Sequence, residues 1–170
     1  MGISIQKISI TDLQTDAVVN AANAQLEAGG GVCGAIFQAA GYSELRTACR
    51  AIGSCPTGQA VITPGFHLKA RYIIHAVGPV WHGGNRGEPQ LLCSAYRQSL
   101  QLAQENGCRS IGFPLISAGI YGYPQELAWQ QALQACRDFL QEQGDILDII
   151  FAVLNDRILR TGESLLNQNM

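Results

Sequence analysis

Apolar and polar residues alternate along the chain in two kinds of segment. Short apolar runs predict strands at residues 3–10, 16–20, 59–63, 71–76, 110–116 and 148–154. Longer segments with apolar residues every three or four positions predict helices at residues 33–40, 42–51, 88–106, 124–142 and 157–168. Strands that alternate with helices are typical of an α/β domain. The pattern therefore predicts a three-layer α/β/α fold with a mixed, mostly parallel central sheet.

Composition supports a folded core and limits the classes of partner. Apolar residues make up 47% of the 170 residues and charged residues 14%, whereas about 25% is usual for charged residues. We expect one domain over residues 1–170. A net charge of −2 offers no basic surface for nucleic acid. Because no membrane span or secretory signal is recognisable, we expect a cytoplasmic monomer that binds neither nucleic acid nor membrane.

The six cysteines and three histidines do not have the spacing of a metal site. No C-x-x-C pair occurs, and the histidines are not at zinc-finger intervals. We therefore expect no metal and no cofactor, and we expect the thiols to be reduced. Of the cysteines, only Cys33 lies in a segment that looks functional.

Two glycine-rich segments follow predicted strands. The first is Asn20-Ala-Ala-Asn23 with Gly29-Gly-Gly-Val-Cys-Gly34, and the second is Ser117-Ala-Gly-Ile-Tyr-Gly122. A strand, a glycine turn and a helix start bring backbone N–H groups together at the positive end of a helix dipole. Ligands of such sheets bind beyond the carboxyl ends of the strands, so both loops are expected to border one crevice. Two loops of this kind indicate a ligand with two phosphates.

The order of motifs resembles a known family. The most specific motifs are Val19-Asn-Ala-Ala-Asn23, Gly29-Gly-Gly-Val32, Cys55-Pro-Thr-Gly-Gln-Ala-Val-Ile-Thr63, His75-Ala-Val-Gly-Pro-Val-Trp81 and Ser117-Ala-Gly-Ile-Tyr-Gly-Tyr-Pro124. Over roughly residues 3–165 the chain resembles macrodomains, most closely the bacterial O-acetyl-ADP-ribose deacetylase type. The resemblance implies a cleft for ADP-ribose or a related nucleotide diphosphate. An ADP-ribosylated protein is a further candidate partner.

The resemblance also implies which residues contact the ligand. At the two loops these are Asn20, Asn23, Gly30, Gly31, Val32, Cys33, Gly34, Ser117, Ala118, Gly119, Ile120, Tyr121 and Gly122. At the adenine end they are Ser9, Ile10 and Leu154. Backbone N–H groups of both loops are suitable donors to phosphate, and the Asn23 amide offers a donor and an acceptor to ribose hydroxyls.

The first loop departs from the deacetylase pattern at its most important position. Members of that type have an aspartate, credited with orienting the hydrolytic water, where this chain has Cys33, and a histidine where it has Phe37. A neutral thiol is a poor acceptor, so in one interpretation Cys33 fills space and hydrolysis is weak or lost. In the other, Cys33 is a thiolate that acts as a nucleophile or redox-sensitive thiol. A thiolate needs a base; His82 is the candidate, and His75 is no clear one.

The adenine end departs as well. Ser9 occupies the position of an aspartate that accepts from the adenine amino group, and Leu154 that of an aromatic residue. A hydroxyl accepts without charge assistance, and an aliphatic side chain covers less of a base. We expect a weakened or altered base preference.

Three hypotheses for function remain open. The first is an ADP-ribose-binding macrodomain with low or absent hydrolase activity. The second is an active hydrolase of O-acetyl-ADP-ribose or ADP-ribosyl carboxylates. There, Asn23 and an α-phosphate oxygen hold the attacking water. The candidate catalytic residues are Asn23 in this hypothesis and Cys33 in the third. The third is thiol chemistry at Cys33.

Overall fold

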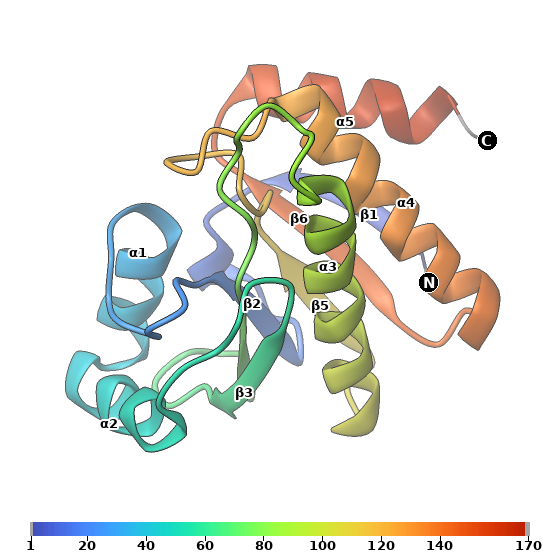
Figure 1. Ribbon diagram of the computed structural model, residues 1–170. Helices are drawn as coiled ribbons and strands as arrows, with labels where there is room; N and C mark the ends of the chain where they lie inside the picture. The colour runs from blue at the N-terminus through green and yellow to red at the C-terminus, as the bar shows by residue number, and fades with distance from the viewer. Residues whose placement is uncertain (1, 169–170) are drawn as a thin grey trace.

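The computed structural model describes residues 2–168, and a six-stranded sheet forms the centre of this part of the chain (Figure 1). The strands are β1 (Ile3–Lys7), β2 (Ala17–Ala21), β3 (Ala60–Pro64), β4 (Tyr72–Ala76), β5 (Ser110–Phe113) and β6 (Asp148–Val153). Their order is β1-β6-β5-β2-β4-β3, and every neighbouring pair is parallel except β3 and β4. The mixed, mostly parallel sheet predicted from the sequence is confirmed.

Helices cover both faces of this sheet, which confirms the three-layer prediction (Figure 1). One face carries α1 (Gly31–Ala40) and α2 (Tyr42–Ile52). The other carries α3 (Glu88–Glu105), α4 (Gln125–Gln143) and α5 (Asp156–Gln168). Within residues 2–168 no helix is long and apolar enough to span a membrane.

Each face of the sheet has its own apolar core. Toward α3, α4 and α5, the rings of Phe113 and Phe151 stack with centroids 5.5 Å apart, and the Trp129 ring meets Phe151 at 5.1 Å. Toward α1 and α2, Val18 and Ile36 belong to a smaller buried cluster. Because side chains alternate along a strand, central strands such as β2 are apolar on both faces, and this produced the continuous apolar runs in the sequence.

Two strands end earlier than the sequence pattern predicted. Residues 3–10 were predicted as one strand, but β1 stops at Lys7 and a short 3-10 helix (η1, Ile10–Asp12) follows. The Ser9 hydroxyl accepts from the N–H of Thr11 and caps this helix. The strand predicted at 110–116 stops at Phe113, because Pro114 has no N–H to donate to the sheet.

The parallel neighbours β2 and β5 are paired over only a short stretch. These strands pair only at Ala17 with Ile111 and at Val18 with Gly112. The helix that follows β2 is α1 and the first helix after β5 is α4, and these two helices lie on opposite faces. Diverging connections of this kind leave a crevice at the carboxyl ends of the strands.

Close packing of α5 gives a first test of the fold. At Gly162 an added Cβ would lie 2.6 Å from Cζ2 of Trp129 and 2.8 Å from Cδ1 of Ile5. We expect Gly162→Val to lower the free energy of unfolding by about 1–3 kcal/mol, because the buried indole cannot move aside. Ser164→Val, on the exposed side of the same helix, is the matched control. Chemical denaturation curves that coincide for the two variants would contradict this packing.

Candidate functional site

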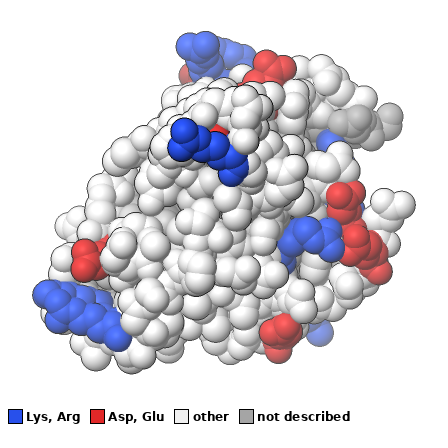
Figure 2. Space-filling model, in the orientation of Figure 1, with Lys and Arg blue, Asp and Glu red and all other residues white. Residues whose placement is uncertain are grey.

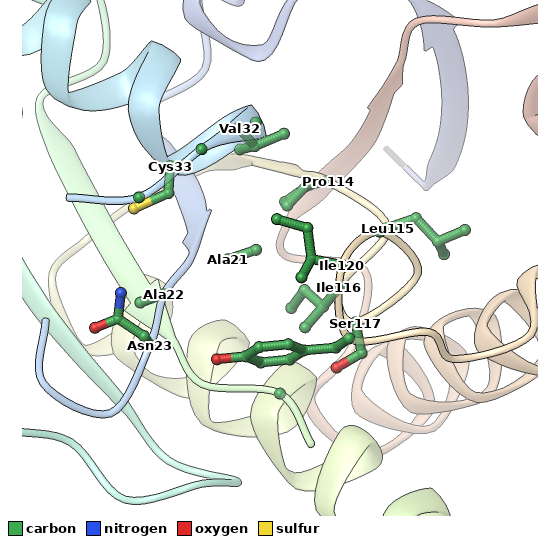
Figure 3. Close-up of a pocket in the computed structure, with 16 residues that line it drawn as sticks. Ala21, Ala22, Asn23, Val32, Cys33, Pro114, Leu115, Ile116, Ser117 and Ile120 are labelled. Atoms are coloured by element: carbon green, nitrogen blue, oxygen red, sulfur yellow. The ribbon is translucent and has the colours of Figure 1, made fainter. Parts of the chain in front are cut away.

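A cleft of about 270 Å³ lies at the carboxyl ends of β2 and β5. In Figure 3, Val32, Cys33 and Asn23 lie on one side of it and Leu115, Ile120 and Ser117 on the other. Its lining residues are Ala21, Ala22, Asn23, Gly29, Gly30, Gly31, Val32, Cys33, Gly78, Pro114, Leu115, Ile116, Ser117, Gly119, Ile120 and Tyr121. The two glycine-rich loops therefore meet at one cleft.

The cleft is uncharged. None of the described residues that line it has a carboxylate, ammonium or guanidinium group. Charged side chains are also sparse on the face seen in Figure 2, where they are separated by wide uncharged areas. Any attraction for an anion must therefore come from backbone N–H groups and the helix dipole rather than from lysine or arginine.

The first loop leads into α1 without a side-chain cap. Gly30 is the N-cap residue of α1, and the first turn of the helix begins with Gly31, whose φ is 58°. The first N–H groups of a helix have no partner inside it, so those of Gly31, Val32 and Cys33 border the cleft and donate to none of the described residues. This is the local geometry of an anion site.

The second loop leaves polar groups unpaired in the same way. Ser117 has a φ of 69°, and the residue is only 6% exposed. Its hydroxyl has no hydrogen-bond partner among residues 2–168. The N–H groups of Gly119, Ile120 and Tyr121 also donate to none of the described residues. A left-handed serine with a buried, unpaired hydroxyl is costly, and such strain is concentrated at functional sites.

A third segment holds the second loop in place. Trp81 donates its backbone N–H to the carbonyl of Tyr121 at 2.8 Å, and its ring packs on Tyr123 with centroids 4.6 Å apart. At Gly78 an added Cβ would collide with the Ser117 hydroxyl. Glycine at position 78 therefore makes room for the turn that carries Ser117.

Glu88 fixes the remainder of this segment. Its side chain is buried, and its carboxylate accepts from the backbone N–H groups of His82 at 2.8 Å, Gly84 at 3.0 Å and Arg86 at 2.6 Å. Burial by itself raises the pKa of the Glu88 carboxyl, but these donors outweigh burial and lower the pKa to about 2. The carboxylate is therefore charged at neutral pH and holds residues 82–88 together.

Beside the cleft, a buried polar network fixes Asn20. Its amide nitrogen lies 3.0 Å from Nδ1 of His75, and Nε2 of that ring lies 3.0 Å from the Thr63 hydroxyl. Burial lowers the pKa of His75 to about 4, so the ring is neutral at physiological pH. Both ring nitrogens of His75 thus have hydrogen-bond partners within the core. Within residues 2–168, no three His, Cys, Asp or Glu side chains are grouped as metal ligands would be.

The structure separates the predicted ligand-binding residues into two groups. Those that line the cleft are Asn23, Gly30, Gly31, Val32, Cys33, Ser117, Gly119, Ile120 and Tyr121. Those that lie outside its lining are Ser9, Ile10, Asn20, Gly34, Ala118, Gly122 and Leu154. Asn20 is 1% exposed and Ile10 is buried, whereas Leu154 is 69% exposed beyond the end of β6. His82, the candidate base for a Cys33 thiolate, is also not a lining residue.

Several lining residues were not named individually as ligand contacts from the sequence, although Ala21, Ala22 and Gly29 belong to the first glycine-rich segment. The full set is Ala21, Ala22, Gly29, Gly78, Pro114, Leu115 and Ile116. Two signals were available: Gly78 lies in the motif that follows a predicted strand, and Pro114 marks the point where β5 must stop pairing. Ala21 and Ala22 carry no chemistry of their own, and only the divergence of β2 and β5 brings them to the cleft.

Comparison with known proteins places the chain in a family. The family model described as "Macro domain" matches residues 19–132. The chain belongs to the macro domain family. A macro domain-containing protein of Chlorobaculum tepidum is 54% identical over 153 residues, which cover 90% of this chain and 88% of that protein. Another, from Ralstonia nicotianae, is 50% identical over 162 residues, covering 95% and 92%.

Solved macrodomains share the whole architecture. The Oceanobacillus iheyensis macrodomain with ADP superposes with a TM-score of 0.90 at 39% identity, covering 98% of this chain and 92% of that one. The Trypanosoma brucei macrodomain in complex with ADP-ribose superposes with a TM-score of 0.90 at 44% identity, covering 96% and 68%. This macrodomain therefore has the fold of proteins that were solved with adenine nucleotides.

The Glu88 contacts predict a pH-dependent contribution to stability. In this macrodomain the pKa of Glu88 is lowered on folding, so the charged carboxylate stabilises the folded state above about pH 4.5. That stabilisation is lost as the pH falls toward 2, because the unfolded state takes up the proton first. We expect Glu88→Gln to lower the melting temperature clearly at pH 7.

The difference in melting temperature between wild type and Glu88→Gln should become smaller as the pH is lowered from 5 to 2.5. Thermal melts followed by circular dichroism measure this difference. Glu163→Gln, which removes an exposed carboxylate from the middle of α5 without touching residues 82–88, is the control. A gap that stays constant across this range would contradict the assigned role of the Glu88 charge.

Proposed function

We propose that this macrodomain binds ADP-ribose through its two glycine-rich loops and has little or no hydrolase activity. One observation carries the proposal: unpaired backbone N–H groups of Gly31 to Cys33 and of Gly119 to Tyr121 border one uncharged cleft. Two clusters of donors suit two phosphates. The macrodomains from Oceanobacillus iheyensis with ADP and from Trypanosoma brucei with ADP-ribose support the choice of ligand.

The free energy of such hydrogen bonds is sufficient for micromolar binding. A hydrogen bond to a charged group contributes about 1.5–3 kcal/mol. Association itself costs at least about 4 kcal/mol, and a Kd near 1 μM corresponds to about −8 kcal/mol. Four to six charge-assisted bonds therefore account for micromolar binding without a lysine or arginine.

The side chains at the cleft favour binding over hydrolysis. The polar ones are those of Asn23, Cys33, Ser117 and Tyr121, and none of these residue types is a strong base at neutral pH. A hydrolase that relied on the substrate's own phosphate to orient water would lack a positioned base. That loss costs about 10²–10⁴-fold in rate. Hydrolysis of O-acetyl-ADP-ribose is therefore the second candidate, and the assay below decides between the two.

The proposal extends to location and partners. The structural likeness covers 98% of the chain, which supports residues 1–170 as a single macrodomain. Ile120 is 92% exposed at the rim of the cleft, so the site opens to solvent. An ADP-ribose group attached to another protein could therefore enter the cleft, and we extend the proposal to recognition of ADP-ribosylated protein. We also propose that the protein is a cytoplasmic monomer.

Gly119 provides a sharp test of binding. An added Cβ at Gly119 meets no atom within 4 Å, so Gly119→Ala should leave affinity unchanged. Gly119→Glu brings a negative charge to the loop, and we expect it to weaken ADP-ribose at least about 100-fold in isothermal titration calorimetry. Gly119→Gln, of the same size without the charge, separates repulsion from bulk. Absence of heat and of any thermal shift with wild type at millimolar ADP-ribose would overturn the proposed function.

Turnover decides between binder and hydrolase. With O-acetyl-ADP-ribose at a saturating concentration, we expect wild type to release acetate at no more than about one hundredth of the rate of an active deacetylase assayed in parallel. The readout is acetate release by chromatography, with ADP-ribose affinity measured on the same sample. A rate within tenfold of the active enzyme would establish the hydrolase and refute the binding-only function.

A further inference from the structure

We propose that Cys33 is a positioning residue whose thiol holds the first glycine-rich loop through a hydrogen bond to the carbonyl of Glu27. This inference rests on the proposed function, because it assigns the role of one residue in forming the ADP-ribose cleft. It differs from both interpretations of Cys33 drawn from the sequence, which made this residue an inert filler or a nucleophile.

The first observation is the direction of the Cys33 side chain. Its sulfur lies 3.6 Å from the carbonyl oxygen of Glu27 and donates to it, while the residue as a whole is only 6% exposed. In Figure 3 the sulfur lies on the same side of the cleft as Asn23. The thiol therefore joins the start of α1 to the segment that follows β2, across the glycines between them.

The second observation is that Glu27 is held from two directions. Asn23 donates its amide to the Glu27 carbonyl at 2.9 Å and accepts from the Glu27 N–H at 3.0 Å. The Glu27 carbonyl oxygen thus accepts two hydrogen bonds, one from the Asn23 amide and one from the Cys33 thiol. A carbonyl oxygen has two lone pairs, and here both have a protein donor.

The third observation is that the rest of the loop is tightly folded around this point. Leu26 is buried with a φ of 58°, an unusual conformation for a leucine. An added Cβ at Gly34 would lie 2.5 Å from the carbonyl oxygen of Gly29, so the loop lies directly on the first turn of α1. Small changes at position 33 will therefore shift Gly29 to Gly31, whose backbone borders the cleft.

The chemistry of residue 33 decides whether this arrangement can exist. A thiol can donate to a carbonyl, whereas an ionised aspartate only accepts and would face the Glu27 oxygen with like polarity. A donor at position 33 therefore suits the loop as it is folded in this chain, and an aspartate at this position would lack the hydrogen bond to Glu27.

No base supports the alternative of a nucleophilic thiol. His75 is held in the core network and is neutral at physiological pH, and His82 does not line the cleft. In its hydrogen bond to Glu27 the Cys33 sulfur is the donor, so the thiol faces a backbone carbonyl rather than the side chain of a base. The geometry thus favours a thiol that positions the loop.

Four variants test the inference in two independent measurements. Cys33→Ser keeps a donor, Cys33→Ala removes it, and Cys33→Asp replaces it with an acceptor. Cys55→Ala is the matched control, because Cys55 is another buried thiol that donates to a backbone carbonyl, that of Pro56, away from the cleft lining. The measurements are amide hydrogen exchange of residues 27–34 in the unliganded protein and calorimetric affinity for ADP-ribose.

We expect the exchange of residues 27–34 to accelerate in Cys33→Ala and Cys33→Asp and to remain close to wild type in Cys33→Ser. Affinity should fall about fivefold in Cys33→Ala, with Cys33→Ser within about threefold of wild type. Cys55→Ala should lower thermal stability while it changes neither loop exchange nor affinity.

Unchanged loop exchange in Cys33→Ala or in Cys33→Asp would overturn the positioning role. Acceleration in Cys55→Ala equal to that in Cys33→Ala would do the same, because it would show a general effect of losing a buried thiol. Failure of wild type to bind ADP-ribose would refute the proposed function instead. The exchange measurement on the unliganded protein would still decide the role of Cys33.

Discussion

Beyond Val18 and Gly112, β2 and β5 no longer pair, and the rest of the site depends on this divergence. The helices that follow these strands, α1 and α4, lie on opposite faces of the sheet, so no connection fills the space between the strand ends. Pro114 enforces the end of β5 because it has no N–H for the ladder. Both glycine-rich loops start at this opening, and they border one cleft for that reason.

Recognition in this cleft depends on the backbone. Uncapped N–H groups at the start of α1 face the same space as those after Ser117, and no charged side chain of the described residues lines it. Fixed donors on two rigid elements lose little conformational entropy when a ligand binds. Three contacts maintain the geometry: Cys33 and Asn23 on Glu27 for the first loop, and Trp81 on Tyr121 for the second.

The architecture could be predicted from the sequence because it depends on local signals: apolar runs of strand length, helical periodicity and glycine turns. Strand ends were less predictable, since Ser9 caps η1 through a hydrogen bond that no periodicity reveals. The direction of a side chain was not predictable at all. Asn20 follows the same pattern as Asn23, yet its amide pairs with His75 in the core, whereas the Asn23 amide pairs with the Glu27 backbone beside the cleft. The partner of Cys33 depends likewise on how the loop folds back, which only the structure gives.

Binding of the ADP-ribose diphosphate by main-chain amides of the two loops can be measured by titrating ¹⁵N-labelled protein with ADP-ribose and following the amide chemical shifts. We expect saturable shifts at 1:1 stoichiometry for Gly31, Val32, Gly119, Ile120 and Tyr121. The remote Gly53 and Gly144, which follow the ends of α2 and α4, should not shift. Saturable binding that leaves the amides of both loops unshifted would contradict binding by these amides.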